Sequence, residues 1–147
     1  MRVLVDTNVF LDLLLKREPF FEDGVEFINK CRRERHEIYV NAMQFRDIEY
    51  FIRKHAENKK TYDMLINGVY GIVTKVIPLT ADDAINAIFE PGKDFEDTLL
   101  ANSAETAGIQ SIVSSNAKDF YPTNIRAFTL KEFNQLKPSK HYLNGEW

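Results

Sequence analysis

Short apolar runs alternate with stretches of helical periodicity along the chain. The runs at Val3–Val5 and Ile112–Val113 have the continuity of strands that are buried on both faces, and further strands are expected at Ile38–Val40, Val73–Ile77 and Ala127–Phe128. Between them, apolar residues recur at spacings of three and four, which predicts amphipathic helices. Because parallel strands need helical crossovers, the alternation predicts a three-layer α/β/α fold around a mainly parallel sheet of about five strands.

Side chains able to cap a helix precede four of the helical segments. They are Asn41 with Gln44, Thr80, Asp94 with Asp97, and Thr129 with Glu132. We expect the helix that begins at Asn41 to carry Phe45, Ile48, Phe51 and Ile52 inward. Pro91 with Gly92 should end the helix that Thr80 begins, and Gly108 should end the helix that Asp94 begins. A short turn is expected at Lys118–Pro122.

The composition indicates a single globular domain. The 147 residues are 44% hydrophobic and 28% charged, and we assign residues 1–138 to the domain and 139–147 to a C-terminal tail. The single cysteine, Cys31, excludes an internal disulfide and is expected to be an inert helix residue. Asp6, Asn8 and Asp12 interrupt the first apolar stretch, so we expect neither a membrane anchor nor a signal peptide there. We therefore expect a cytoplasmic protein.

The charge balance limits the kind of nucleic-acid surface that the chain can form. Nineteen Lys and Arg oppose 22 Asp and Glu, a net charge of −3, which excludes a uniformly cationic surface. Any basic patch must therefore be local. Arg46 is the first choice among the cations that could contact a nucleic acid, and Lys118 is a further candidate. The basic cluster from Lys30 to His36 is expected to be a solvated helix face.

Polar side chains follow the predicted strands at the points where they end. Asp6 and the segment Ser114–Asn116 follow two of them, Asp47 lies just after a third, and Asp94 with Asp97 opens a helix. Each acid alone has a simpler role as a helix cap or a solvated charge. Together they would meet at one edge of the sheet. Carboxylates gathered in one pocket repel one another unless a cation compensates them, and oxygen-only ligands favour Mg²⁺ or Mn²⁺.

Four segments of the sequence resemble the motifs of the PIN domain family, including its toxins of VapC type. VLVDTNVFLDLLL is similar to the family's opening, and VNAMQFRDIEYFI to its second motif, whose frame selects Asp47 over Glu49. DFEDTLLANSAETAGIQSIVSSNAKDF resembles the third and fourth motifs together. The resemblance extends from Arg2 to about Phe128 and keeps the family's motif order.

The resemblance implies a metal-dependent endoribonuclease, with a type II toxin as one role and an antitoxin as the implied partner. Asp6 and Asp97 would bind Mg²⁺ or Mn²⁺, with Asp94 as a further acid, while Asp47 would bind the ion or orient the attacking water. Asn116 would act through a water or hold Asp6. The side chains expected to fix the carboxylates are Thr7, Asn8 and Ser114, and those expected to contact RNA are Arg46 and Lys118.

Two positions depart from the family's usual pattern. Asp47 stands where Glu is more usual, which shortens the reach of the carboxylate by one methylene. Asn116 stands where many members carry Asp, which removes a negative charge, although members with Asn there and a downstream Asp-Phe pair, as at Asp119 and Phe120, form a familiar subgroup. These departures keep open an alternative, a PIN-shaped nucleic-acid or protein-binding module with a weakened, noncatalytic metal site.

Two other enzyme and signalling classes also place Asp after a first strand. A haloacid-dehalogenase-type phosphotransferase needs a second Asp two residues later, where this chain has Asn8. A phospho-accepting receiver domain needs a paired acid after the first strand, which Asp6 lacks. Both classes fit the sequence less well than a PIN nuclease does.

The aromatic content bears on partners. Eleven Phe and six Tyr are more than a small core requires, so Tyr62–Tyr70 is a candidate homodimer contact or antitoxin groove, with simple core packing as the plainer interpretation. We expect a homodimer that does not bind membranes.

Overall fold

The computed structural model describes residues 1–89, 94–120 and 124–138. Its centre is a sheet of five strands in the order β3-β2-β1-β4-β5, and every neighbouring pair is parallel. The strands are β1 (Arg2–Val5), β2 (Glu37–Asn41), β3 (Lys75–Ile77), β4 (Ser111–Val113) and β5 (Arg126–Phe128). The predicted sheet is thus confirmed, and it is parallel throughout.

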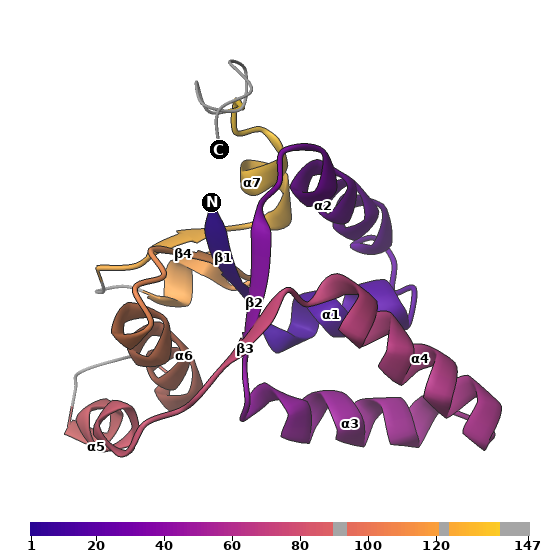
Figure 1. The fold of residues 1–147 in the computed structure, drawn as a ribbon, viewed down its shortest axis with the longest axis horizontal. Coiled ribbons are helices and arrows are strands. Elements are labelled where there is room, and N and C mark those ends of the chain that lie inside the picture. The colour runs from indigo at the N-terminus through magenta and orange to yellow at the C-terminus, as the bar shows by residue number, and fades with distance from the viewer. Residues whose placement is uncertain (90–93, 121–123, 139–147) are drawn as a thin grey trace.

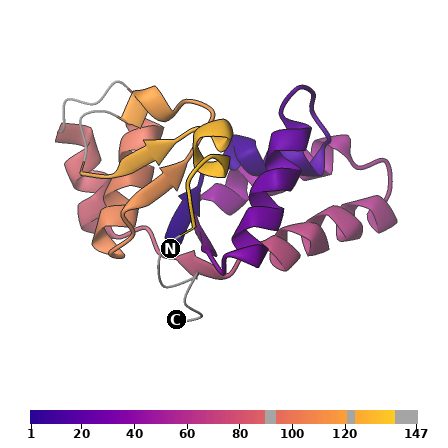
Figure 2. The same cartoon turned by 90° about the horizontal axis from the view of Figure 1, so that it is seen from above.

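Helices cover both faces of the sheet, as Figures 1 and 2 show. The helices are α1 (Thr7–Leu14), α2 (Phe21–Arg33), α3 (Gln44–His55), α4 (Lys59–Ile72), α5 (Ala81–Phe89), α6 (Phe95–Thr106) and α7 (Leu130–Asn134), with a 3-10 turn η1 at Ala117–Phe120. The first four lie on one side together with α7, which packs on α2, whereas α5 and α6 lie on the other. This is the expected three-layer α/β/α arrangement.

Alternate residues of the central strands enter two separate cores. In β1, Val3 and Val5 belong to the core under α1, α2 and α3, while Leu4 belongs to the core under α6. All three side chains are fully or almost fully buried. Burial on both faces explains why the strands appear in the sequence as continuous apolar runs rather than as alternating ones.

The capping predictions are confirmed except at the start of α3. Thr80, Asp94 and Thr129 accept backbone hydrogen bonds three residues ahead, and Gly108, at φ +73°, follows α6. Asn41 is wrong as a helix start, because it is still paired with β3 at the end of β2, so α3 begins only at Gln44. Pro91, Gly92, Tyr121, Pro122 and residues 139–147 lie outside the described residues, as does any tail there.

The basic cluster at the end of α2 is not a solvated face throughout. Lys30 is only 3% exposed, and its ammonium group donates to the carbonyl of Leu136 at 2.6 Å and pairs with the buried Glu34 at 2.7 Å. The packing of α7 against α2 buries this pair, which sequence periodicity does not reveal. The neighbouring Cys31 is buried, and burial, aided by the charge of Glu34, raises the pKa of its thiol to about 12, as expected of an inert residue. No helix in the described ranges is long and apolar enough to cross a bilayer.

Candidate active site

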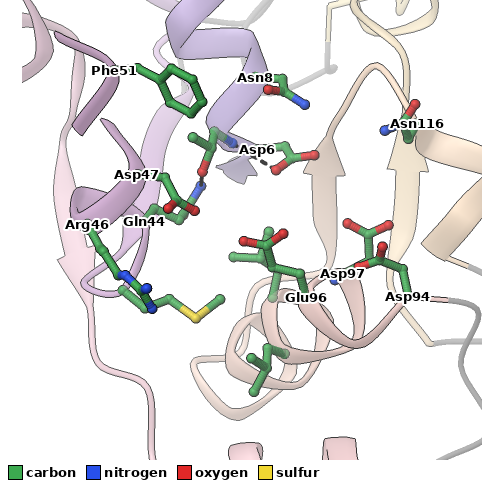
Figure 3. Close-up of a pocket in the computed structure, with 14 residues that line it drawn as sticks. Asp6, Asn8, Gln44, Arg46, Asp47, Phe51, Asp94, Glu96, Asp97 and Asn116 are labelled. Atoms are coloured by element: carbon green, nitrogen blue, oxygen red, sulfur yellow. Dashed lines mark hydrogen bonds between the residues drawn. The ribbon is translucent and has the colours of Figure 1, made fainter. Parts of the chain in front are cut away.

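The site lies where the strand order of the sheet changes direction. The chain runs outward from β1 through β2 to β3 and then returns to β4 on the other side of β1. In open parallel sheets, the crevice at the carboxyl ends of two such strands is the usual ligand site. A pocket of about 360 Å³ lies at this edge (Figure 3). It is lined by Asp6, Thr7, Asn8, Met43, Gln44, Arg46, Asp47, Phe51, Asp94, Glu96, Asp97, Leu99, Leu100 and Asn116.

Asp6 is fixed at the centre of the pocket by two hydrogen bonds. It caps α1 through Oδ1, which accepts from the backbone N–H of Thr7 at 2.8 Å. Its Oδ2 accepts from the hydroxyl of Ser114 at 2.7 Å. Ser114 is fully buried, and its Oγ also accepts from the backbone N–H of Asn116. Burial nevertheless raises the pKa of Asp6 above its ordinary value, so this carboxylate is held rigidly at an electrostatic cost.

The first turn of α6 supplies three acids on one wall. Asp94 caps the helix by accepting from the N–H of Asp97 at 3.0 Å, and Glu96 and Asp97 also line the pocket. Partial burial, followed by the charges of Asp6 and Asp94, raises the pKa of Asp97 to about 7. The ionised form of Asp97 is therefore disfavoured first by burial and then by the neighbouring negative charges.

The opposite wall comes from α3, which contributes Arg46, Asp47 and Phe51 (Figure 3). Asp47 lies close enough to Glu96 to raise its pKa, an effect second only to burial. Phe51 is half-buried and lines the pocket rather than filling the core as expected. The acids of α3 and α6 thus face each other across the cavity, with Asp6 between them.

Two lining residues were not foreseen as functional, Glu96 and Gln44. Glu96 lies between two acids already singled out, and only its place in the first turn of α6 could have indicated it. Gln44 is 2% exposed. Its Nε2 donates to the carbonyl of Val5 at 2.8 Å and to Thr7 Oγ1 at 3.2 Å, and its Oε1 accepts from the N–H of Asn41 at 2.7 Å. Gln44 therefore ties the start of α3 to the end of β1 beside Asp6.

Replacing Gln44 with alanine should destabilise the protein by about 1 to 3 kcal/mol, because the Val5 carbonyl and the Asn41 N–H would lose their side-chain partner inside the protein. Urea unfolding measures the change. The matched control is Gln110→Ala, an exposed glutamine whose loss should change the free energy of unfolding by less than about 0.5 kcal/mol. Equal effects of the two variants would contradict the tethering role of Gln44.

The remaining sequence candidates occupy different places. Asn116 and Asn8 both line the pocket and are exposed, and Ser114 lies behind it, against Asp6. Thr7 lines it and holds Gln44. Arg46 lines it and is exposed, whereas Lys118 lies in η1 and is not among the lining residues.

The donor chemistry of the pocket fits a hard divalent cation. The acids offer only oxygen atoms. Burial, and then the neighbouring carboxylates, raise the pKa values of Asp6, Glu96 and Asp97, so a bound cation would favour their ionised forms. Over the described ranges, no three acidic, imidazole or thiol side chains are already grouped closely enough to hold a metal ion. Side chains from opposite walls would therefore have to draw together around a cation.

Solved structures share this fold at low sequence identity. VapBC2 from Rickettsia felis bound to a promoter DNA fragment has a TM-score of 0.67 at 14% identity, with 88% of this chain and 98% of that one covered. A toxin-antitoxin complex from Klebsiella pneumoniae has 0.63 at 16%, covering 87% and 97%. The sarcin-ricin loop cleaving toxin VapC20 from Mycobacterium tuberculosis has 0.58 at 13%, covering 75% and 86%. At these identities the likeness shows the fold alone.

The sequence itself provides the family assignment. No curated protein matches the chain. The family model described as PIN domain matches residues 2–118, which include every acid that lines the pocket. The resemblance of the four motifs is thereby confirmed, and the chain belongs to the PIN domain family.

Proposed function

We propose that the protein is a metal-dependent endoribonuclease that hydrolyses RNA phosphodiester bonds. The observation that carries the proposal is the convergence of Asp6, Asp47, Asp94, Glu96 and Asp97 on one pocket at the carboxyl ends of the central strands. Hydrolysis of a phosphodiester requires an activated water, neutralised phosphate oxygens and a stabilised leaving oxygen. A pocket of opposed carboxylates that holds a divalent ion meets all three needs.

The acids have different proposed roles in hydrolysis because different elements of the fold hold them. Asp6 and Asp97 would hold Mg²⁺ or Mn²⁺, with Asp94 beside them, and the bound ion would supply Lewis-acid polarisation of the phosphate and a water of lowered pKa. Asp47, on the opposite wall, would help to hold the ion or accept a proton from the attacking water. Ser114 and Thr7 keep Asp6 in one orientation, and Asn116 is placed to act through a water or to support Asp6.

Substrate binding is assigned to cations at the rim. Arg46 is exposed and lines the pocket, so its guanidinium is placed for an RNA phosphate beside the reacting one. Lys118 would contact the strand farther from the acids. The VapC20 toxin, whose sarcin-ricin loop substrate is RNA, supports an RNA target for this fold. Action on cellular RNA implies a cytoplasmic protein.

We also assign to the protein the role of toxin in a type II toxin-antitoxin pair, acting as a homodimer. The toxin-antitoxin complex from Klebsiella pneumoniae supports an antitoxin partner. The Tyr62–Tyr70 stretch contributes both to core packing and to the exposed surface. Tyr62, Leu65, Ile66 and Val69 pack in the core, whereas Met64 and Tyr70 are exposed and available to a partner. Sedimentation of the purified chain measures the predicted dimer.

Cleavage of total cellular RNA tests the nuclease directly. Discrete fragments are expected with Mg²⁺ or Mn²⁺ and none with chelator. Intact RNA under all conditions would favour the second candidate function, a noncatalytic binding module. The neutral side chain of Asn116 at the pocket is the observation that supports this alternative. Asn116→Asp would then separate the two, because restored charge should produce cleavage only in a weakened nuclease.

Millimolar Mn²⁺ should raise the melting temperature of the wild-type protein. A ligand present at about one hundred times its Kd adds about 2.7 kcal/mol to the folded state, which corresponds to about 5 to 10 °C in a domain of this size. Differential scanning calorimetry measures the shift, with NaCl at equal ionic strength as the control. An unchanged melting temperature would contradict a cation site among the carboxylates.

A further inference from the structure

A second pocket lies at the same edge of the sheet and adjoins the acidic one. Its volume is about 280 Å³, and it is lined by Val9, Asp12, Pro19, Phe20, Asp23, Ser115, Thr129, Leu130 and Lys131. Two pairs of consecutive residues connect the cavities. Asn8 and Asn116 line the acidic pocket, and the next residue of α1, Val9, and the preceding residue, Ser115, line the second one. The two pockets are therefore neighbours, and an RNA strand with a phosphate at the acids would pass beside the second one.

The walls of the second pocket are apolar and include one aromatic ring. Val9 and Leu130 are buried and form part of its lining, and Pro19 and Phe20 lie at its exposed side. Phe20 is 44% exposed, so part of its ring is open to a ligand. Single-stranded RNA is recognised mainly by stacking of its bases on such rings. The volume lies near the lower end of ligand pockets, which suits one base.

The polar end of the pocket is a carboxylate with spare acceptor capacity. Asp12 is 7% exposed, and its carboxylate contacts Arg17 at 3.7 Å, which is longer than a hydrogen bond. Arg17 is its charged partner, and an ion pair at this distance leaves lone pairs of the carboxylate open to further donors. A buried carboxylate in this state is an acceptor for two adjacent donors of a ligand.

Guanine is the base that matches this acceptor. Its N1–H and its exocyclic N2–H point in the same direction and can both donate to one carboxylate. Adenine, cytosine and uracil each place an acceptor on that edge, which a carboxylate would repel. The lining also holds Asp23 and Lys131, so with Arg17 beside Asp12 two cations balance two carboxylates. This balance gives a cationic peptide side chain little net attraction, while Lys131 and Arg17 suit the phosphates of RNA.

We propose that this pocket is a base-specificity site that receives a guanine flanking the scissile phosphate, with the base stacked on Phe20 and its Watson–Crick edge bound by Asp12. The proposal rests on the proposed ribonuclease function for its substrate. It adds a sequence preference that the acidic pocket alone does not provide, because contacts to phosphate carry no base information.

Binding of free nucleosides tests the pocket without any cleavage. Guanosine, inosine and adenosine are titrated into ¹⁵N-labelled protein while the amide resonances of Val9, Ser115 and Leu130 are followed. Guanosine should shift all three, inosine should bind more weakly because it lacks the N2 amine, and adenosine should have little effect. Equal responses to guanosine and adenosine, or no response to guanosine, would overturn the proposal.

Variants identify the two contacts. Asp12→Asn and Phe20→Ala should each weaken guanosine binding at least about fivefold. Their controls are Asp63→Asn, an acid-to-amide change in another ion pair, and Phe89→Ala, an exposed ring on α5, both expected to bind guanosine normally. Unchanged binding by Asp12→Asn with a native amide spectrum would reject the assignment. A stronger response to N-acetyl-arginine amide than to guanosine would assign the pocket to a basic peptide instead.

Mapping of RNA cleavage ends separates this proposal from the proposed function. Wild-type cut sites should be enriched in guanosine at one position beside the cleaved bond, and Asp12→Asn should lose that enrichment. If guanosine binds but RNA is not cut, the nuclease assignment fails and the pocket stands. If RNA is cut with no guanosine enrichment and no guanosine binding, the pocket assignment fails and the nuclease stands.

Discussion

Replacement of Asp6 by asparagine is expected to lower RNA cleavage about a thousandfold or more while the protein stays folded. The amide removes the central negative charge of the pocket, and the loss of several kcal/mol of charge stabilisation corresponds to that factor. The fold should tolerate the change because asparagine caps a helix as well as aspartate does, so the contact with the Thr7 N–H can persist. The Ser114 hydroxyl can rotate to accept from the new amide.

Cleavage rates on RNA and circular dichroism spectra are measured together for this variant. Asp63→Asn, a half-buried acid that is paired with Lys59 and does not line the pocket, is the control and should cleave at the wild-type rate. Full activity in Asp6→Asn would remove the carboxylate from the mechanism. Inactivity accompanied by an altered spectrum would make the result a folding defect, and the melting temperature decides between these outcomes.

Replacement of Asp97 by asparagine should also abolish cleavage, yet it should stabilise the metal-free protein. Burial and the neighbouring charges of Asp6 and Asp94 raise the pKa of Asp97 to about 7, so its ionised form is held against repulsion. Asparagine removes that repulsion. After allowance for solvent screening of a half-exposed carboxyl, the gain is about 1 to 2 kcal/mol at pH 8.

The gain should depend on pH in a defined direction. Because the folded pKa lies above the unfolded value of 3.8, the folded wild type binds more protons than the unfolded chain between about pH 4 and 7. The contribution of Asp97 to wild-type stability therefore falls as pH rises through that window. The advantage of Asp97→Asn should be near zero at pH 4 and complete above pH 7.

Urea unfolding in chelator at pH 4, 6 and 8 measures this advantage. Asp82→Asn, an exposed first-turn acid of α5, is the control and should show no comparable gain. A destabilised Asp97→Asn at pH 8 would contradict the view that the acids repel one another. Addition of Mn²⁺ should reverse the order, because the cation stabilises only the protein that retains its carboxylates.

The sequence predicted the architecture because its local signals agree with the fold. Buried parallel strands leave continuous apolar runs, as at Val3–Val5, and caps such as Thr129 with Glu132 act within one turn. The position of Asp6 at the end of β1 followed from the same rule. The start of α3 could not be placed, because the pairing of Asn41 with β3 is a contact with a strand more than 30 residues away.

The parts of the site that depend on tertiary packing were not predictable. Glu96 belongs to the pocket because α6 turns its first turn toward α3, and the periodicity of α6 does not reveal that direction. Gln44 appeared to be a capping residue, and its tether to Val5 depends on how α3 docks on the sheet. Lys30 is buried only because α7 closes over α2. In each case the deciding contact joins segments that are distant in sequence.

The chemistry of the fragment ends tests the central claim most directly. RNA is incubated with wild type or Asp6→Asn, with Mg²⁺ or with chelator, and the new termini are identified. Attack by water on the phosphate should leave 5′-phosphate and 3′-hydroxyl ends, only with wild type and only with metal. Fragments that end in 2′,3′-cyclic phosphate, or that persist in chelator or with Asp6→Asn, would contradict hydrolysis at the carboxylate pocket.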